Sequence, residues 1–183
     1  LNENSYTWYV NQYKDHPAIL MWEFGNEFNY HPEWFGGNID NWYSLLETAA
    51  ANVKTIDPNH PVSTGNGEVP SLDVINSCPS VDVWGMNIYR FLNTTSAITD
   101  LASYSDKAMY ISESGADSFN NNQQSENQSQ QALATEQILN SVLSYSDLCA
   151  GITLFEFCDE WWKAGDPNSH DPGGFPISVA YDN

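Results

Sequence analysis

The chain has 183 residues, of which 41% are hydrophobic, a length sufficient for one well-buried domain and short for two. Its 24 acidic residues outnumber 5 basic residues, giving a formal net charge of −19. Such a polyanion repels phosphate backbones and anionic lipid surfaces, so we expect neither nucleic acid nor a membrane as a partner. The charge suits a neutral substrate, and it indicates either an acidic surface alone or adaptation to salt.

Helices and strands are predicted to alternate along the whole chain. The first helix has aromatic residues along one face and ends at His16 and Pro17. The helix at 40–56 has apolar residues at helical spacing, with Asp40 as its expected cap. A polar segment at 120–131 is expected to be a mobile loop. In chain order, the expected elements are a helix at 5–15, a strand at 18–24, a helix at 40–56, a strand at 61–64, a helix at 71–77, a strand at 81–89, a helix at 95–105, a strand at 107–112, a helix at 129–146 and a strand at 151–157.

This alternation is typical of an α/β fold with a parallel sheet and crossover helices. A doubly wound sheet would carry a glycine-rich turn after its first strand, and this sequence has none. A (β/α)8 TIM barrel, whose strand ends carry catalytic residues, fits better, although such barrels take about 250 residues for eight strands. We therefore predict a single partial TIM-barrel domain over residues 1–183, with five strands.

Two of the predicted strands end in a glutamate close to a glycine. The first run is Ile-Leu-Met-Trp-Glu-Phe-Gly-Asn-Glu27, and the second is Ala-Met-Tyr-Ile-Ser-Glu113-Ser-Gly. Parallel strands bring their carboxyl ends to one rim, so Glu27 and Glu113 are expected to face a common site. A pair of carboxylates is the arrangement that glycosidic bond cleavage requires.

These motifs resemble the retaining glycoside hydrolases of the large (β/α)8 clan that includes β-galactosidases, β-glucuronidases, mannanases and cellulases. The resemblance rests on Gly-Asn-Glu27 after a Trp-containing strand, Asn87-Ile-Tyr89 on a later strand, and Ser-Glu113-Ser-Gly on the next. In that clan, the Asn-Glu pair ends strand four and the second glutamate ends strand seven. The resemblance thus implies that the chain spans strands four to eight of the barrel.

The resemblance also implies roles for individual residues. Glu27 would be the general acid/base and Glu113 the nucleophile of a double displacement at a β-linked glycoside. Asn26 would hydrogen-bond the sugar 2-hydroxyl, and Tyr89 would donate to Glu113. The remaining candidates for substrate binding are Asn87, His31 in an aromatic loop, and Trp161 (or its neighbour Trp162) as a platform under a sugar ring.

For several other polar residues, a structural role is an alternative to a functional one. Glu23 lies within an apolar strand, and we expect it to be a structural partner for Arg90 or for a residue outside the segment. Glu156 is expected to be structural, while Glu160 could contact substrate. The oxygen-rich stretch at 166–171 lacks the spacing of a calcium loop, so no metal is expected there.

The cysteines and the chain ends bear on cofactors, compartment and assembly. Cys78, Cys149 and Cys158 are too few for a disulfide framework or a zinc motif, and no cofactor is expected. The compartment is not fixed by the sequence, and a secreted or periplasmic location is favoured. We expect the chain to be a piece of a longer protein, or to form a homodimer through its exposed barrel edges or interior.

Two function classes stay open at this stage. The first is a retaining glycosidase acting on a carbohydrate substrate, and the second is a non-catalytic fragment or sugar-binding module that keeps the cleft. The identity of the sugar, and exo or endo action, are not fixed by the sequence.

Overall fold

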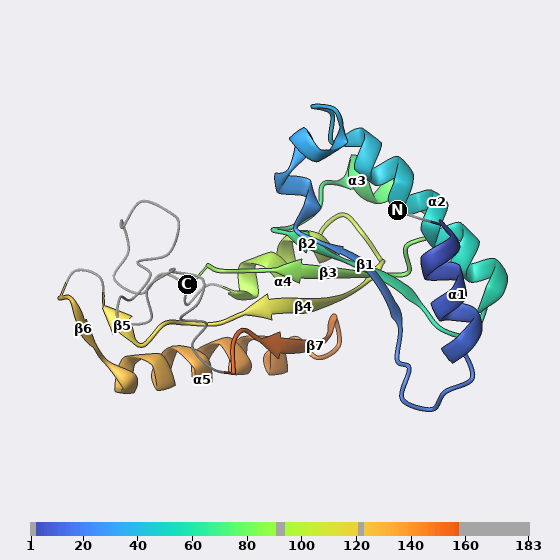
Figure 1. The fold of residues 1–183 in the computed structure, drawn as a ribbon. Coiled ribbons are helices and arrows are strands. Elements are labelled where there is room, and N and C mark those ends of the chain that lie inside the picture. The colour runs from blue at the N-terminus through green and yellow to red at the C-terminus, as the bar shows by residue number, and fades with distance from the viewer. Residues whose placement is uncertain (1–2, 91–93, 121–122, 158–183) are drawn as a thin grey trace.

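The computed structural model describes residues 3–90, 94–120 and 123–157. Five parallel strands form one sheet in the order β1-β2-β3-β4-β7 (Figure 1). The strand order follows the chain order in one direction, as in a singly wound barrel, and does not reverse as in a doubly wound sheet. The predicted parallel α/β class is confirmed, and the sheet is compatible with part of a TIM barrel.

The helices alternate with the strands of this sheet and differ from the predicted ranges by a few residues at their ends. They are α1 (Glu3–Tyr13), α2 (Asp40–Ile56), α3 (Leu72–Ser77), α4 (Thr94–Ala102) and α5 (Gln128–Ser144), with short 3-10 turns η1 (Phe28–Tyr30) and η2 (Pro32–Phe35). The strands of the sheet are β1 (Trp22–Asn26), β2 (Val62–Gly67), β3 (Val83–Asn87), β4 (Ala108–Ser114) and β7 (Cys149–Leu154).

Three of the sequence expectations need correction. The strand predicted from residue 18 begins only at Trp22, because residues 16–19 form a turn in which the Ile19 amide bonds the His16 carbonyl. Part of the expected loop at 120–131 is instead a small antiparallel hairpin, β5 (Phe119–Asn120) and β6 (Ser125–Glu126). Asp40 is the first residue of α2, and its amide is capped by the Asn38 side chain at 3.0 Å.

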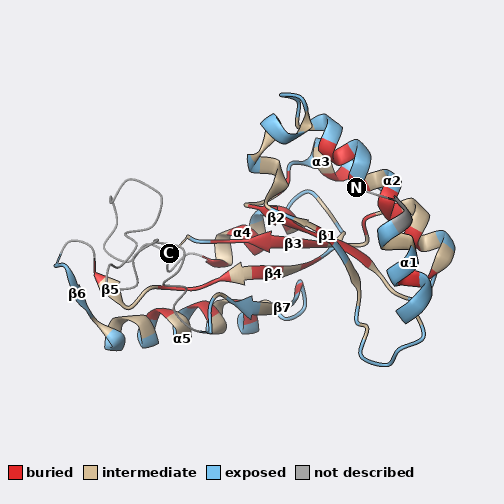
Figure 2. Cartoon of the chain, in the orientation of Figure 1, coloured by how far each residue is buried: buried red, intermediate tan, exposed pale blue. Residues whose placement is uncertain are grey.

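The apolar core lies between the strands and the helices. Trp84 and Met86 of β3 lie in register with Met109 and Ile111 of β4, and all four are buried. Leu46 of α2 is also fully buried in this core. Figure 2 shows the buried residues concentrated in the strands and in the helix faces turned toward them. Burial of this kind stabilises a fold by about 25 cal/mol for each Å² of apolar surface.

The residues that alternate with this core line the other face of the sheet, here called the inner face. Glu23 lies opposite Ser63, and Gly65 lies opposite Gly85, which in turn lies opposite Tyr110. The inner face thus carries polar side chains and glycines, whereas the opposite face carries tryptophan and methionine. This division places the polar groups of several strands on one surface.

Strands β1 and β7 are the two edges of the sheet. Leu154 on β7 is 42% exposed, and Phe157 just beyond it is fully exposed. Exposed apolar edges favour association, and the homodimer expected from the sequence stays a prediction. The single domain over residues 1–183 also stays a prediction, because residues 158–183 lie outside the described ranges.

Two of the three cysteines, Cys78 and Cys149, are buried free thiols. Among the helices of the described ranges, none combines the length and apolar character needed to cross a bilayer.

Candidate active site

The end of β1 owes its shape to a bulge and a left-handed residue. Glu23 pairs with Ser63 and Asn26 pairs with Gly65, so β1 has one more residue than β2 between these two pairs. Regular alternation would turn Asn26 away from the inner face, and the extra residue turns it back. Gly25 has φ +74, and Glu27 has φ 56, in the left-handed region. A non-glycine residue held at such a φ costs about 1–3 kcal/mol, and such strain is typical of functional sites.

Gly25 is required by space as well as by its backbone angle. A Cβ at this position would lie 2.7 Å from two ring carbons of Trp42 on α2. The helix therefore packs directly against the bulge, and the amide of Glu27 is fixed in turn by a 2.8 Å hydrogen bond to the Gly65 carbonyl. The position of Glu27 thus follows from core packing on one side and strand pairing on the other.

Asn87, at the end of β3, connects both glutamate-bearing strands. Its Nδ2 donates to Oδ1 of Asn26 at 2.9 Å and to Oε1 of Glu27 at 3.1 Å. Its Oδ1 accepts from the Ser112 hydroxyl at 2.6 Å. Asn87 is only 2% exposed, so these bonds lie out of bulk water, where hydrogen bonds are stronger.

A second register shift brings Glu113 to the same rim. Met86 faces Ile111 but Asn87 faces Glu113, so β4 has one extra residue at this point. The shift lets both Ser112 and Glu113 reach the inner face, where regular alternation would admit only one of them. The sequence prediction placed Glu113 beyond its strand, whereas it lies within β4, which continues to Ser114.

The phenol of Tyr89 donates a 2.9 Å hydrogen bond to Oε2 of Glu113. Burial raises the pKa of this phenol, and the charge and hydrogen bond of Glu113, followed by the charges of Glu27 and Glu156, raise it further. Tyr89 therefore stays protonated and is a donor at any pH near neutrality.

The loop after Glu27 is held against β2. The Asn29 side chain donates to the Gly67 carbonyl at 2.9 Å and accepts from its amide at 2.8 Å. Tyr30 lies over the same glycine, where a Cβ would clash with its ring. Burial raises the pKa of Tyr30, the charges of Glu27 and Glu68 raise it further, and the charge of Arg90 lowers it.

His31, an expected substrate contact, lies further along this loop. Its ring stacks on Trp34 with centroids 3.8 Å apart, and its Nδ1 lies 2.8 Å from Oε1 of Glu33. Trp34 is 59% exposed, so the pair forms an open aromatic surface on the loop. The structure gives His31 no contact with the glutamate pair, and its role in binding stays a prediction.

The expected pairing of Glu23 with Arg90 is wrong. Arg90 instead bonds the carboxylate of Glu68, with its Nη2 at 2.5 Å, and also reaches Asp100 at 3.2 Å. Glu23 lies too deep along β1 for this contact and accepts hydrogen bonds from Ser63 and Tyr110 on the inner face. Its position within an apolar strand is thus explained by the polar inner face.

Several expected contacts fall on residues outside the described ranges. They are Trp161, Trp162, Glu160, Cys158 and the oxygen-rich stretch at 166–171. In the described part of the chain, no three His, Cys, Asp or Glu side chains gather closely enough to hold a metal ion.

Sequence reasoning missed four residues that shape the site: Ser112, Tyr110, Asn29 and Tyr30. Ser112 and Tyr110 precede Glu113 by one and three residues, and strand alternation alone could have placed them on one face. Asn29 and Tyr30 had no such signal, because their contacts depend on how the loop folds back over Gly67.

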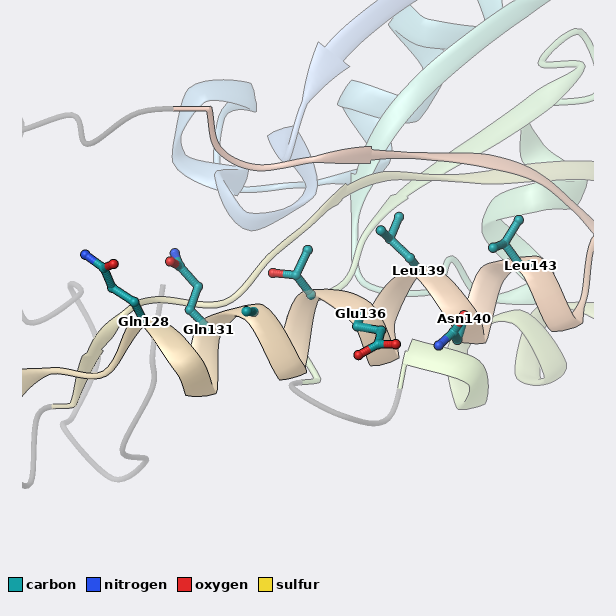
Figure 3. A pocket seen from close by; sticks show the side chains of 8 residues that line it. Gln128, Gln131, Glu136, Leu139, Asn140 and Leu143 are labelled. Atoms are coloured by element: carbon teal, nitrogen blue, oxygen red, sulfur yellow. The ribbon is translucent and has the colours of Figure 1, made fainter.

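A surface groove lies away from the glutamates, along α5 (Figure 3). All its lining residues belong to that helix, including Leu139 and Leu143. None of them is a candidate catalytic residue, so the groove is separate from the rim that carries Glu27 and Glu113.

Comparisons with known sequences find relatives over part of the chain. The chain is 43% identical to mannan endo-1,4-β-mannosidase F of Aspergillus clavatus over 56 residues, which are 31% of this chain and 12% of the relative. It is 39% identical to the protein of the same name from Aspergillus fumigatus over 57 residues, again 31% of this chain and 12% of the relative. No family model matches the sequence.

Comparisons with solved structures cover most of the chain. Bacteroides uniformis β-glucuronidase 2 aligns with a TM-score of 0.68 and 17% identity, over 85% of this chain and 21% of that one. The β-D-glucuronidase of Dictyoglomus thermophilum aligns with a TM-score of 0.60 and 17% identity, over 86% and 29%. A β-glucosidase aligns with a TM-score of 0.58 and 12% identity, over 87% of this chain and 58% of that one. The chain therefore shares the fold of the aligned part of these glycoside hydrolases, and it spans less than two thirds of the length of each relative named here.

Proposed function

We propose that this chain carries the catalytic glutamates of a retaining glycoside hydrolase that cleaves β-linked glycosides. The observation that carries the proposal is the Asn87 link, which joins the Asn26-Glu27 end of β1 to Ser112 beside Glu113 on β4. A double displacement requires two carboxyl groups about 5–5.5 Å apart. The Asn87 link supports such a pairing of Glu27 and Glu113.

Glu113 is the proposed nucleophile. In the first step, its carboxylate oxygen attacks the anomeric carbon while the bond from that carbon to the leaving oxygen breaks. The protonated phenol of Tyr89, 2.9 Å from Oε2, stabilises the carboxylate and orients it for attack. In the second step, water attacks the same carbon and the ester bond to Glu113 breaks.

Glu27 is the proposed general acid/base. It gives its proton to the leaving oxygen in the first step and takes one from the attacking water in the second. Asn87 fixes its Oε1 by a 3.1 Å hydrogen bond, and the left-handed backbone at Glu27 sets the direction of the side chain. Such fixed geometry is a large part of what positioning contributes to rate.

Asn26 is the proposed contact to the sugar 2-hydroxyl. Its Oδ1 accepts from Asn87, so its Nδ2 is the atom that we propose donates to the sugar. The hydrogen bond from Asn87 fixes which of the two atoms faces the substrate. A contact of this kind tightens in the transition state and contributes several kcal/mol.

The names of the relatives support the proposed substrate class. The sequence relatives are named endo-1,4-β-mannosidases, while the structural neighbours include β-glucuronidases and a β-glucosidase. We propose a β-linked glycan as substrate, with β-1,4-mannan as the first one to test. The net charge of −19 disfavours a uronic acid substrate.

The test is hydrolysis of β-1,4-mannan and of aryl β-mannoside, β-glucoside, β-galactoside and β-glucuronide by the full chain. Glu113→Gln should abolish turnover of whichever substrate is cleaved. Glu27→Gln should still release the aglycone in one burst from a dinitrophenyl glycoside, since that leaving group needs no proton. Glu136→Gln, on the exposed side of α5, is the matched control and should leave kcat unchanged.

The alternative is a sugar-binding module without catalysis. Binding of the corresponding oligosaccharides without hydrolysis of β-1,4-mannan or of any of the four aryl glycosides would favour it over the proposal. Turnover that persists in Glu113→Gln would also contradict the proposed nucleophile.

A further inference from the structure

A hydrogen-bonded cluster lies on the inner face, one layer below the glutamate pair. The Tyr110 hydroxyl donates to Oε2 of Glu23, and the Ser63 hydroxyl donates to the same oxygen at 3.1 Å. Glu23 is on β1 and Tyr110 is on β4, so this contact joins two strands that are separated by β2 and β3. They are also the two strands that carry Glu27 and Glu113.

A glycine on β3 leaves room for the Tyr110 ring. Gly65 of β2 and Gly85 of β3 lie in register with each other, and Gly85 lies in register with Tyr110. A Cβ at Gly85 would lie 2.8 Å from Cε1 of Tyr110, whereas a Cβ at Gly65 would be in ordinary contact with Oε1 of Glu23 at 3.7 Å. Gly85 therefore provides the space in which the phenol passes over β3 toward Glu23.

Two register shifts lie between this layer and the strand ends that carry the glutamates. The register shift in β1 lies between Glu23 and Asn26, and the shift in β4 lies beyond Ile111. Both irregularities therefore separate the Tyr110 layer from the glutamates. A bulge bends its strand and loosens the ladder locally. A contact below the two bulges therefore adds to the Asn87 link above them in holding the two ends at a set spacing.

We propose that Tyr110 and Glu23 form a brace across the inner face that sets the separation of the Glu27 and Glu113 carboxyls. This inference rests on the proposed function, in which a separation of about 5–5.5 Å permits retention and a wider one of about 6.5–9.5 Å does not. Tyr110 and Glu23 are thus positioning residues, which act through the strands and do not touch the reacting atoms.

The protonation of the brace suits this role. Burial raises the pKa of the Tyr110 phenol, and the hydrogen bond and charge of Glu23 raise it further. The phenol therefore keeps its proton across the neutral range, and the donor of the brace is constant under assay conditions.

Three variants separate the geometry of the brace from its charge. Tyr110→Phe removes the donor, Glu23→Asp keeps the charge but shortens the side chain, and Glu23→Gln keeps the length and an acceptor oxygen. We expect Tyr110→Phe and Glu23→Asp to lower kcat about 10- to 100-fold with little change in KM, and Glu23→Gln to lower it by less than about threefold. Tyr104→Phe removes another phenol, bonded to the Pro70 carbonyl at 2.6 Å, and should leave kcat unchanged.

The opposite ranking would overturn the proposal. Full activity in Glu23→Asp with loss in Glu23→Gln would assign Glu23 a role by charge, and a rise in KM alone would assign Tyr110 to substrate binding. Equal losses of kcat in Tyr104→Phe and Tyr110→Phe would show that removing either phenol acts only through overall stability.

Amide hydrogen exchange gives a second readout that needs no turnover. The amides of Glu27 and Ile88 bond the carbonyls of Gly65 and Glu113, both at 2.8 Å. They should exchange faster in Tyr110→Phe and Glu23→Asp than in the wild type and Tyr104→Phe. This pattern in a chain that cleaves no glycoside would uphold the brace while the proposed function fails. Turnover without either effect would refute the brace alone.

Discussion

Replacing Asn87 with alanine removes the link between the two catalytic strands. The change deletes the donor to Asn26 at 2.9 Å, the donor to Glu27 at 3.1 Å and the acceptor of Ser112 at 2.6 Å. Two neutral hydrogen bonds contribute about 1 kcal/mol each and one to a carboxylate about 1.5–3 kcal/mol, together about 4 kcal/mol. A domain stable by about 5–15 kcal/mol would remain mostly folded.

The loss in rate should exceed what instability explains. A displaced general acid costs about 100-fold in kcat, and we expect Asn87→Ala to show this loss on an aryl glycoside well below its unfolding temperature. Thermal and urea unfolding, followed by circular dichroism, give the folded fraction under the assay conditions.

Asn66 on β2 offers a matched control. It is 4% exposed, its Nδ2 donates to the carbonyls of Gly67 and Glu68, and its Oδ1 accepts from Tyr43 on α2. Asn66→Ala should cost a similar amount of stability but leave kcat per folded molecule within about threefold of the wild type. Equal losses of kcat in Asn66→Ala and Asn87→Ala would refute the reasoning.

Three further predictions concern stability. Gly25→Ala should lower the free energy of unfolding by about 1–3 kcal/mol more than Gly36→Ala, because both glycines have φ above +70° but only the Cβ at Gly25 meets Trp42. Equal losses in urea unfolding would contradict this packing argument. Glu27→Gly should have a free energy of unfolding about 1 kcal/mol greater than that of Glu27→Ala, because glycine relieves the strain of the left-handed backbone. Both variants should lack turnover of unactivated glycosides. Equal midpoints of thermal unfolding would show that the backbone there is unstrained. Burial alone would raise the pKa of Asp57, but hydrogen bonds from an indole, an imidazole and a backbone amide hold this pKa below its ordinary value. The contribution of Asp57 to folding stability is therefore present above about pH 4 and is lost as pH falls through the folded-state pKa. The margin of wild type over Asp57→Asn, measured by urea unfolding from pH 7 to pH 2, should therefore shrink toward acid, and a constant margin would count against it.

The sequence was sufficient for the parallel sheet and for the two strand ends, because continuous apolar runs and helical periodicity follow local rules. It also indicated that Tyr89 would lie near Glu113, on the strength of a family resemblance. The sequence could not predict that Glu113 lies within β4, or that Asn26 and Glu27 lie on one face. Both features depend on β-bulges, which the alternation of apolar and polar residues does not reveal.

The partners of charged residues were harder to predict than the elements. Arg90 was expected beside Glu23, yet it pairs with Glu68, which is held in a left-handed conformation where β2 ends. The Tyr110–Glu23 contact spans two intervening strands and depends on the glycine at position 85 of β3. Contacts of this range come from register, which is set only when the strands pair.

Trapping the glycosyl-enzyme intermediate tests the central claim most directly. A 2-deoxy-2-fluoro glycoside with a good leaving group slows the second step, so the covalent ester persists and can be mapped by mass spectrometry after digestion. The label is expected on Glu113 in the wild type and on no residue in Glu113→Gln. A label on another carboxylate, or turnover that inverts the anomeric centre and leaves no label, would contradict the assignment of Glu113 as nucleophile.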